Sequence, residues 1–232
     1  MSYSVWVAVG IAMAALAARW QGEQVPLPSI QRTGLLLCAI GGAILGAYGL
    51  QLPADLLGWA APAPAGLGPD ALPLGGRTVL GGLIGGWVAV ELGKRQLGIT
   101  RPTGDGFALP LALALAFGRL GCAAAGCCGG AVCADVWWSL HDSDQVARYP
   151  VQLLESAFHF GCAAWLALAS QRPWAKGRRL AIYLSLYAVL RFGLEFVRTN
   201  PPLWLGLRWH QWLALLLLAL AGGTWWQRSR RK

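Results

Sequence analysis

Residues 106–125 read GFALPLALALAFGRLGCAAA, a run of twenty residues in which Arg119 is the one charged side chain. A helix rises 1.5 Å per residue, so a run of this length covers roughly 30 Å, the thickness of the hydrocarbon core of a membrane. A charge at that depth costs about 2.5–3.5 kcal/mol on insertion scales. The run therefore predicts a membrane-spanning helix that keeps a costly arginine for a purpose.

Six further apolar runs of similar length accompany it, at residues 3–18, 34–50, 77–93, 151–170, 180–197 and 209–226. Of the 232 residues, 56% are hydrophobic and 12% are charged, whereas soluble domains carry about 25% charged residues. Helices satisfy their backbone hydrogen bonds internally, which lipid requires. We therefore expect an all-α integral membrane protein, with residues 1–232 forming a single domain of seven transmembrane helices.

Positive charge gathers in three segments, which are the connections 94–105 and 171–179 and the tail after residue 227. With seven spans, all three lie on one side of the membrane if the N-terminus is periplasmic and the C-terminus is cytoplasmic, as the positive-inside rule favours. Residues 52–76 and 126–150 are then periplasmic loops. The net charge of +9 is explained by topology, and we expect no nucleic-acid partner.

Polar residues converge at one predicted depth, in the outer leaflet. Counting along the helices places Arg119 about 20 Å, Arg191 about 17 Å and Glu195 about 23 Å above the inner ends of their spans. Gln152 and Glu155 open the 151–170 run and lie within about 6 Å of its outer end. We therefore predict that Arg119 and Arg191 face one shared cavity.

The spacing within each helix agrees with this convergence. Tyr187, Arg191 and Glu195 are four residues apart and form one stripe. Gln152, Glu155 and His159 also share one face. Arg binds phosphate through a planar fork and stays charged when desolvated, so the pattern favours a lipid-phosphate site open to the outer leaflet.

Each of these features also has a purely structural interpretation. Arg191 and Glu195 are spaced as an ion pair, and Arg119 has the length to reach the outer headgroups. His159 is typical of a histidine satisfied inside a bundle. Glu91 is expected to pair with Lys94 or Arg95. The small-residue patterns Gly42/Gly46, Gly81/Gly85 and Gly82/Gly86 predict close helix packing.

Four motifs in the chain resemble those of the prolipoprotein diacylglyceryl transferases. They are LGGLIG at 80–85, GRLG at 118–121, PVQLLE at 150–155, and a last motif in and directly after the 180–197 run, made of Tyr187, Arg191, Glu195 and Arg198. The resemblance covers about residues 76–200 and implies a seven-helix bundle with its site on the periplasmic side of the bacterial inner membrane. It implies an enzyme that transfers diacylglyceryl from phosphatidylglycerol to the lipobox cysteine of a prolipoprotein and releases glycerol phosphate.

The resemblance also implies roles for single residues. Arg119 and Arg191 would hold the lipid phosphate, while Tyr187 and Glu195 would orient the site. Further substrate-binding positions would be Gly81, Gly82, Gly121, Cys122, Gly130, Gln152, Glu155 and Arg198. No metal and no cofactor are expected.

The chain departs from the family pattern at four positions. Leu80 and Tyr149 stand where the family has histidines, Cys122 where it has asparagine, and Cys127 where it has an acidic residue. The two arginines that would hold the phosphate are kept, whereas the family's histidines and acidic residue, which would transfer protons, are replaced. We therefore expect Cys127 to have a catalytic role and leave open a thiol acceptor other than a prolipoprotein.

Cys122, Cys127, Cys128 and Cys133 fall within twelve residues. Cys122 and Cys127 would lie about 500° apart around a continuous helix and so would not share a face. We therefore expect Cys127, Cys128 and Cys133 to gather in the loop, apart from Cys122. Structural disulfides, an exchanging thiol and soft-metal capture are the three interpretations. The last two define an alternative function, a membrane thiol protein that binds soft metal or relays redox equivalents without lipid chemistry.

Overall fold

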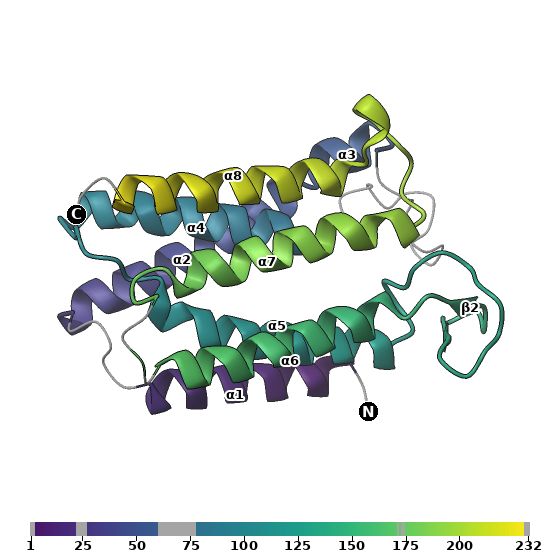
Figure 1. Cartoon of the computed structure of the whole chain (residues 1–232), viewed down its shortest axis with the longest axis horizontal. Helices are drawn as coiled ribbons and strands as arrows, with labels where there is room; N and C mark the ends of the chain where they lie inside the picture. Colours follow the sequence, from purple (N-terminus) through teal and green to yellow (C-terminus); the bar gives the residue numbers. More distant parts are fainter. Residues whose placement is uncertain (1–2, 22–26, 60–77, 171, 173–174, 230–232) are drawn as a thin grey trace. The chain divides into compact units, whose positions relative to one another are not determined.

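The computed structural model describes residues 3–21, 27–59, 78–170, 172 and 175–229 (Figure 1). Within these ranges, one long helix covers each of the seven predicted apolar runs, which confirms the all-α class. The helices are α1 (Tyr3–Trp20), α2 (Ser29–Gly49), α4 (Val79–Gln96), α5 (Asp105–Ala124), α6 (Val151–Ser170), α7 (Arg179–Leu194) and α8 (Trp209–Ser229). The short elements are α3 (Leu52–Leu56), the 3₁₀ turns η1 (Glu195–Val197) and η2 (Trp204–Gly206), and strands β1 (Leu140–His141) and β2 (Ala147–Arg148).

Five of the described helices are long and apolar enough to cross a membrane. They are α1, α2 extended through α3, α5, α6, and α7 extended through η1. The other two long helices are more polar, since α4 carries Glu91, Lys94 and Arg95 and α8 begins with His210 and Gln211. The structure thus supports a multi-pass membrane protein, while the number seven and the orientation of the termini stay predictions.

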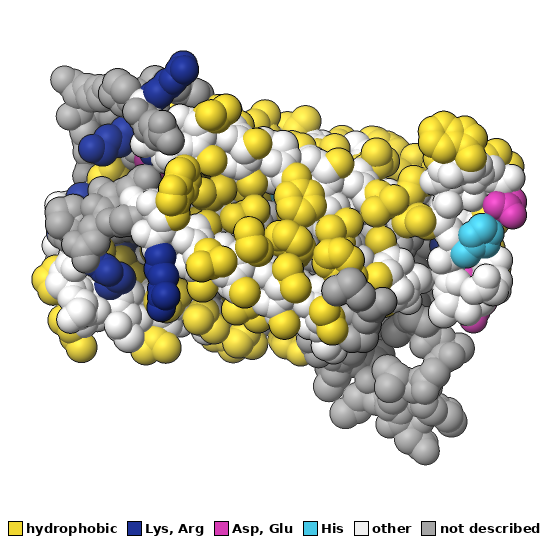
Figure 2. All heavy atoms as spheres, turned by 90° about the horizontal axis from the view of Figure 1, so that it is seen from below, with side chains coloured by type: hydrophobic (Ala, Val, Ile, Leu, Met, Phe, Trp, Pro, Cys, Tyr) yellow, Lys and Arg dark blue, Asp and Glu magenta, His cyan; other side chains and the backbone are white. Residues whose placement is uncertain are grey.

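Large hydrophobic side chains are exposed along the spans. Ile11 is 64% exposed on α1, Leu45 is 75% exposed on α2, and Leu168 is 70% exposed on α6. Figure 2 shows such side chains covering one face of the protein. Apolar surface of this extent is unfavourable in water. These helices are therefore suited to contact lipid.

The chain forms two compact units. The first comprises residues 1–26, 102–187 and 196–198, and in it α5 packs against both α1 and α6 (Figure 1). The carboxylate of Asp105, at the start of α5, accepts hydrogen bonds from the backbone N–H groups of Gly177 and Arg179 and so holds the beginning of α7. An acidic group at a helix N-terminus is also favoured by the helix dipole.

The second unit comprises residues 27–101, 188–195 and 199–232, and in it α4 packs against α2 and α8. Small residues set the contact between α2 and α4. A Cβ atom added at Gly46 would lie 2.2 Å from the Gly81 carbonyl oxygen, and one at Gly85 would lie 2.3 Å from that of Gly42. This close approach confirms the packing predicted from the small-residue patterns. The single-domain arrangement over residues 1–232 stays a prediction.

The two predicted loops differ in how much of them is described. The 52–76 segment begins with α3, and residues 60–76 lie outside the described residues. The 126–150 segment holds the antiparallel pair β1–β2, with Leu140 opposite Arg148. Arg148 also pairs with Asp142, which lowers the pKa of that carboxyl group. The second loop is therefore built around a small hairpin.

Candidate functional site

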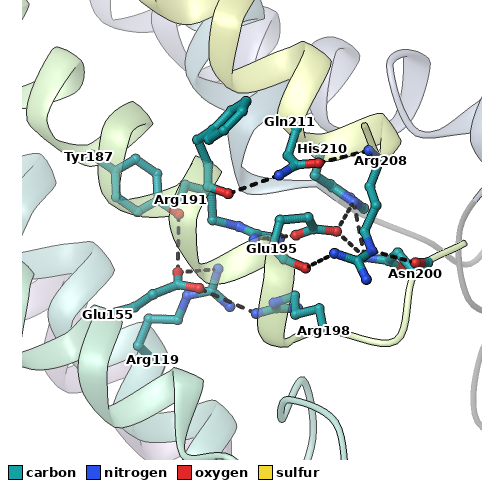
Figure 3. A network of polar contacts seen from close by, with 11 residues as sticks. Arg119, Glu155, Tyr187, Arg191, Glu195, Arg198, Asn200, Arg208, His210 and Gln211 are labelled. Carbon is teal, nitrogen blue, oxygen red and sulfur yellow. Dashed lines mark hydrogen bonds and ion pairs between the residues drawn. The ribbon is translucent and has the colours of Figure 1, made fainter. Parts of the chain in front are cut away.

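A fully buried carboxylate, that of Glu155 on α6, lies at the centre of a polar cluster in the first unit (Figure 3). One guanidinium nitrogen of Arg119 lies 2.6 Å from Glu155 Oε2, and one of Arg198 lies 3.3 Å from Oε1. The hydroxyl of Tyr187 donates a hydrogen bond to Oε2 at 3.1 Å. The structure therefore brings together four of the predicted site residues.

Packing between helices fixes this arrangement. One turn before Arg119, the Ala116 carbonyl accepts a hydrogen bond from Ser156 at 2.9 Å, which joins α5 to α6 beside Glu155. On the other side of α5, a Cβ atom at Gly121 would lie 3.1 Å from Tyr3 and Trp6, so α1 packs closely there. Arg119 is 8% exposed as a result. The arginine is held inside the unit and does not extend along the surface.

Two guanidinium groups, those of Arg119 and Arg198, contact the one carboxylate of Glu155. In addition, the buried Nε atom of Arg119 has no hydrogen-bond acceptor among the described residues. Away from water, a guanidinium group with an unused donor favours an anion, and a phosphate oxygen matches guanidinium geometry.

The cysteines gather beside this cluster because of how α5 ends. Gly126 adopts a left-handed φ of 62°, and Cys127 N–H donates a hydrogen bond to the Cys122 carbonyl at 3.1 Å while Gly126 N–H donates to Ala123 at 3.2 Å. These two bonds form a Schellman motif. The motif folds the chain back, so the sulfur atoms of Cys122, Cys127 and Cys128 all lie within 4.8 Å of one another.

The sequence-based expectation for the cysteines was therefore wrong in two respects. Cys122 belongs to the cluster because the helix ends at Ala124 and does not continue, and Cys133 is not part of it. All six cysteines are free, so no disulfide supports the loop. Gln152 instead joins the loop to α6 by donating a hydrogen bond to the Cys127 carbonyl at 2.7 Å.

The two loop thiols of the cluster are electrostatically unequal. Hydrogen bonds to the sulfur of Cys128 from Cys122 and Cys127 lower the pKa of the Cys128 thiol, and the positive charges of Arg119 and Arg198 act in the same direction. Hydrogen bonding to Cys122 and Cys128 raises the pKa of the Cys127 thiol. The exposed Cys128 is consequently the loop thiol that loses its proton more readily.

A second polar cluster surrounds Glu195 in the second unit (Figure 3). The carboxylate of Glu195 pairs with Arg191 and accepts a hydrogen bond from Asn200, and His210 Nδ1 lies 3.3 Å from its Oε1 atom. Arg208 donates to the Glu195 backbone carbonyl at 2.7 Å. The ion pair between Arg191 and Glu195 is thus present as its spacing predicted.

Sequence reasoning missed Asn200, Arg208 and His210. Each lies outside the helix that carries Glu195, so no helical period connects them to it. A signal was available at the start of α8, where His210 and Gln211 open an otherwise apolar run. Gln211 is fully buried and donates to the Phe192 carbonyl at 3.2 Å, which joins α8 to α7.

The remaining predicted residues have structural neighbours within their own unit. Gly81 and Gly82 face α2, and Gly130 lies against Tyr149 and Val197. His159 is fully buried, with Nδ1 2.8 Å from the Tyr183 hydroxyl.

Two further predictions concern charged pairs. Glu91 pairs with Lys94 at 3.0 Å, as expected. Arg119 belongs to the first unit and Arg191 to the second, and their shared cavity stays a prediction.

Comparison with known proteins gives one consistent family. A family model described as prolipoprotein diacylglyceryl transferase matches residues 1–227. A phosphatidylglycerol–prolipoprotein diacylglyceryl transferase 2 from Clostridium perfringens is 32% identical over 133 residues, which cover 54% of this chain and 52% of that protein. A phosphatidylglycerol–prolipoprotein diacylglyceryl transferase from Dehalococcoides mccartyi is 30% identical over 174 residues, 72% of this chain and 67% of that protein. The chain thus spans between about half and two thirds of these relatives.

Proposed function

Because the chain belongs to the prolipoprotein diacylglyceryl transferase family, we propose that it transfers diacylglyceryl from phosphatidylglycerol to a cysteine thiol. The proposed location is the periplasmic face of the bacterial inner membrane, with the N-terminus on that side. The acceptor would be the lipobox cysteine of a prolipoprotein, as the names of the relatives indicate for those proteins. The alternative, a thiol protein without lipid chemistry, is not favoured by this membership.

The observation that supports the proposal most strongly is the pair of arginines on one buried carboxylate. In the reaction, the acceptor thiol gives up its proton to solvent and its sulfur forms a bond to the glyceryl carbon, while the bond from that carbon to the phosphate oxygen breaks. The electron pair leaves with the phosphate, which gains negative charge. Glu155 holds Arg119 and Arg198 in a buried position from which water is excluded. The two guanidinium groups are therefore already oriented and can stabilise the developing charge without first having to reorganise.

The other residues of the first cluster have supporting roles in this proposal. Glu155 orients both guanidinium groups, and Tyr187 fixes the carboxylate through its hydroxyl. Gln152 positions the cysteine loop. We also propose that Cys127 has the catalytic role that the sequence predicts for it.

Arg191 and Glu195 are proposed as a second required pair, as the family resemblance implies. Both are buried and paired to each other, and Asn200 and Arg208 hold Glu195 in place. Replacing Arg191 by Lys would keep the charge and lose the planar fork. The proposal expects transfer by this variant to fall at least tenfold.

The test uses purified protein in nanodiscs of phosphatidylglycerol and a lipobox peptide containing one cysteine. We expect the mass of the peptide to increase by one diacylglyceryl group, with one glycerol phosphate released per peptide modified. Nanodiscs of phosphatidylcholine and a peptide with serine in place of cysteine are the controls. Complementation of a strain depleted of its own transferase tests the same function in cells.

Two results would contradict the proposal. One is an unmodified peptide under conditions where a known relative modifies it fully. The other is equal modification from phosphatidylcholine, which would show that the donor is not recognised by its glycerol phosphate headgroup.

A further inference from the structure

The three-cysteine cluster has the composition and spacing of a metal site. Thiolates are the ligands that soft metal ions such as Zn²⁺ prefer, at about 2.3 Å from metal to sulfur. Three sulfurs around such an ion lie about 3.8 Å apart, by the tetrahedral geometry of these sites. In the structure, the sulfurs of Cys122, Cys127 and Cys128 are already within 4.8 Å of one another. Closing the site around an ion requires the sulfurs to approach by at most about 1 Å.

The backbone around the cysteines is fixed in advance. Cys122 lies in the last turn of α5, and the Schellman motif places the loop cysteines beside it. A Cβ atom at Gly126 would lie 2.9 Å from the Ser143 backbone nitrogen, so the turn requires glycine. Gln152 anchors the loop to α6. Metal sites need such prepared ligands, since each ligand ordered on binding costs conformational entropy.

The surroundings of the cluster suit bound thiolates with one open position. The guanidinium groups of Arg119 and Arg198 attract negative charge at the Cys128 sulfur. Exposure increases along the cluster, from Cys122, which is 9% exposed, through Cys127, which is half-buried, to Cys128, which is exposed. Three ligands with one accessible side are the arrangement of catalytic zinc sites, whose fourth position receives water or substrate.

We propose that Cys122, Cys127 and Cys128 bind one Zn²⁺ ion whose open fourth position receives the acceptor cysteine as a thiolate. This inference rests on the proposed transferase function and deepens it. When the acceptor binds, its S–H proton passes to solvent and its sulfur becomes the fourth ligand. The sulfur lone pair then forms the bond to the glyceryl carbon, and the carbon–oxygen bond breaks with its electrons going to the phosphate. The thioether product is a weaker ligand and leaves the metal.

This site would compensate for groups that the chain lacks. At the positions where the family has two histidines, an asparagine and an acidic residue, this chain has Leu80, Tyr149, Cys122 and Cys127. The two cysteines among them are ligands in the proposal. A metal ion lowers the pKa of a coordinating thiol, so no separate base is needed to generate the nucleophile.

The first test measures metal on the full chain in detergent. Purified protein is stripped with a chelator, reloaded with Zn²⁺ or Co²⁺ alone, and washed. We expect one equivalent of metal and, with Co²⁺, a sulfur-to-metal charge-transfer band. Replacing Cys122, Cys127 or Cys128 by Ser should weaken Zn²⁺ binding at least tenfold. Cys133→Ser and Cys162→Ser, which lie outside the cluster, should bind as the wild type does.

The second test adds the acceptor. A lipobox peptide with cysteine should strengthen the charge-transfer band of the Co²⁺ protein as a fourth thiolate joins, and the serine peptide should not. Wild-type protein stripped of metal should lose at least tenfold in transfer rate and recover it on addition of Zn²⁺. This measurement needs no variant, so it holds even where a Cys→Ser variant fails to fold.

Three outcomes separate the two proposals. Binding of Zn²⁺ that is the same in wild type and in Cys122→Ser would overturn the metal site. Full transfer by metal-free protein would overturn its role in the reaction and leave the transferase function standing. Metal and peptide binding without transfer from phosphatidylglycerol would confirm the metal site and remove the proposed function.

Discussion

At the scale of single residues, one carboxylate organises the chemistry of the first unit. Glu155 is fully buried and in contact with Arg119, Arg198 and Tyr187. Buried ion pairs are a weak source of stability when complete, because desolvation offsets the attraction. They become strongly destabilising when one partner is removed. Replacing Glu155 by glutamine keeps the shape of the side chain and removes its negative charge. The substitution therefore isolates the role of that charge.

The variant Glu155→Gln should unfold more easily, by about 3 kcal/mol, because two desolvated guanidinium groups lose their counter-charge. Transfer should fall as well, since both arginines lose their orientation. Denaturant unfolding in micelles gives the first quantity and the peptide assay gives the second.

Glu91→Gln is the matched control. Glu91 also pairs with a basic residue, Lys94, but its side chain is 39% exposed. The side chain of Lys94 is only 7% exposed, but water reaches the Glu91 carboxylate and screens the pair, so its loss should cost less than the loss of the fully buried Glu155. A similar loss of stability in both variants would show that burial does not set the energy of the Glu155 cluster.

At the scale of elements, two local devices position the groups described above. The glycine turn after α5 brings three cysteines together, and small residues bring α2 and α4 into close contact. Both depend on the absence of a side chain, in one case to permit a left-handed backbone and in the other to make room. Substitution by alanine tests each with a single methyl group.

Gly126→Ala should destabilise the protein by about 1–3 kcal/mol, because alanine is strained at a φ of 62° and its Cβ would meet the backbone of Ser143. The cysteine cluster should open, which a lower yield of crosslinking between Cys122 and Cys128 by a short reagent with two thiol-reactive maleimide groups would detect. In Gly118→Ala, the added Cβ meets nothing within 4 Å in mid-helix, so stability should stay the same or rise by about 0.5–1 kcal/mol. An equal change of stability in the two variants would contradict the requirement for glycine in the turn after α5.

Gly85→Ala should separate α2 from α4, since the added Cβ would lie 2.3 Å from the Gly42 carbonyl oxygen. Overpacking of this kind costs about 1–3 kcal/mol. Gly41→Ala on α2 adds its methyl group to open space in mid-helix, so stability should stay the same or rise by about 0.5–1 kcal/mol. Thermal unfolding in nanodiscs measures both, and an unchanged melting temperature for Gly85→Ala would contradict close packing.

At the scale of the whole molecule, the sequence predicted the long helices, which depend on local periodicity. It did not predict the contacts that form where the chain turns back on itself. The seven apolar runs locate the long helices within a few residues, because hydrophobic length is a property of contiguous sequence. The contact between Arg198 and Glu155 could not be derived from helical spacing, since Arg198 follows η1 and lies outside α7.

The cysteine cluster shows the same limit. A helical period places Cys122 and Cys127 on different faces, and that argument fails because the helix ends between them. Gly126 after an alanine-rich helix end was a C-cap signal that permitted the correct prediction. Asn200 and Arg208 had no local signal as partners of Glu195, because the folding of a separate segment brings them to it. His210 stood out as a polar residue at the start of an apolar run, but nothing in that run connected it to Glu195.

The central claim is that guanidinium groups around Glu155 stabilise the charge of the departing lipid phosphate. The most direct test is the rate of glycerol phosphate release from phosphatidylglycerol by Arg119→Lys, with Arg95→Lys on the exposed end of α4 as control. Lysine keeps the charge and loses the fork, so the account predicts at least a hundredfold lower rate for Arg119→Lys and an unchanged rate for Arg95→Lys. Equal rates for Arg119→Lys and the wild type, in protein of unchanged stability, would contradict it.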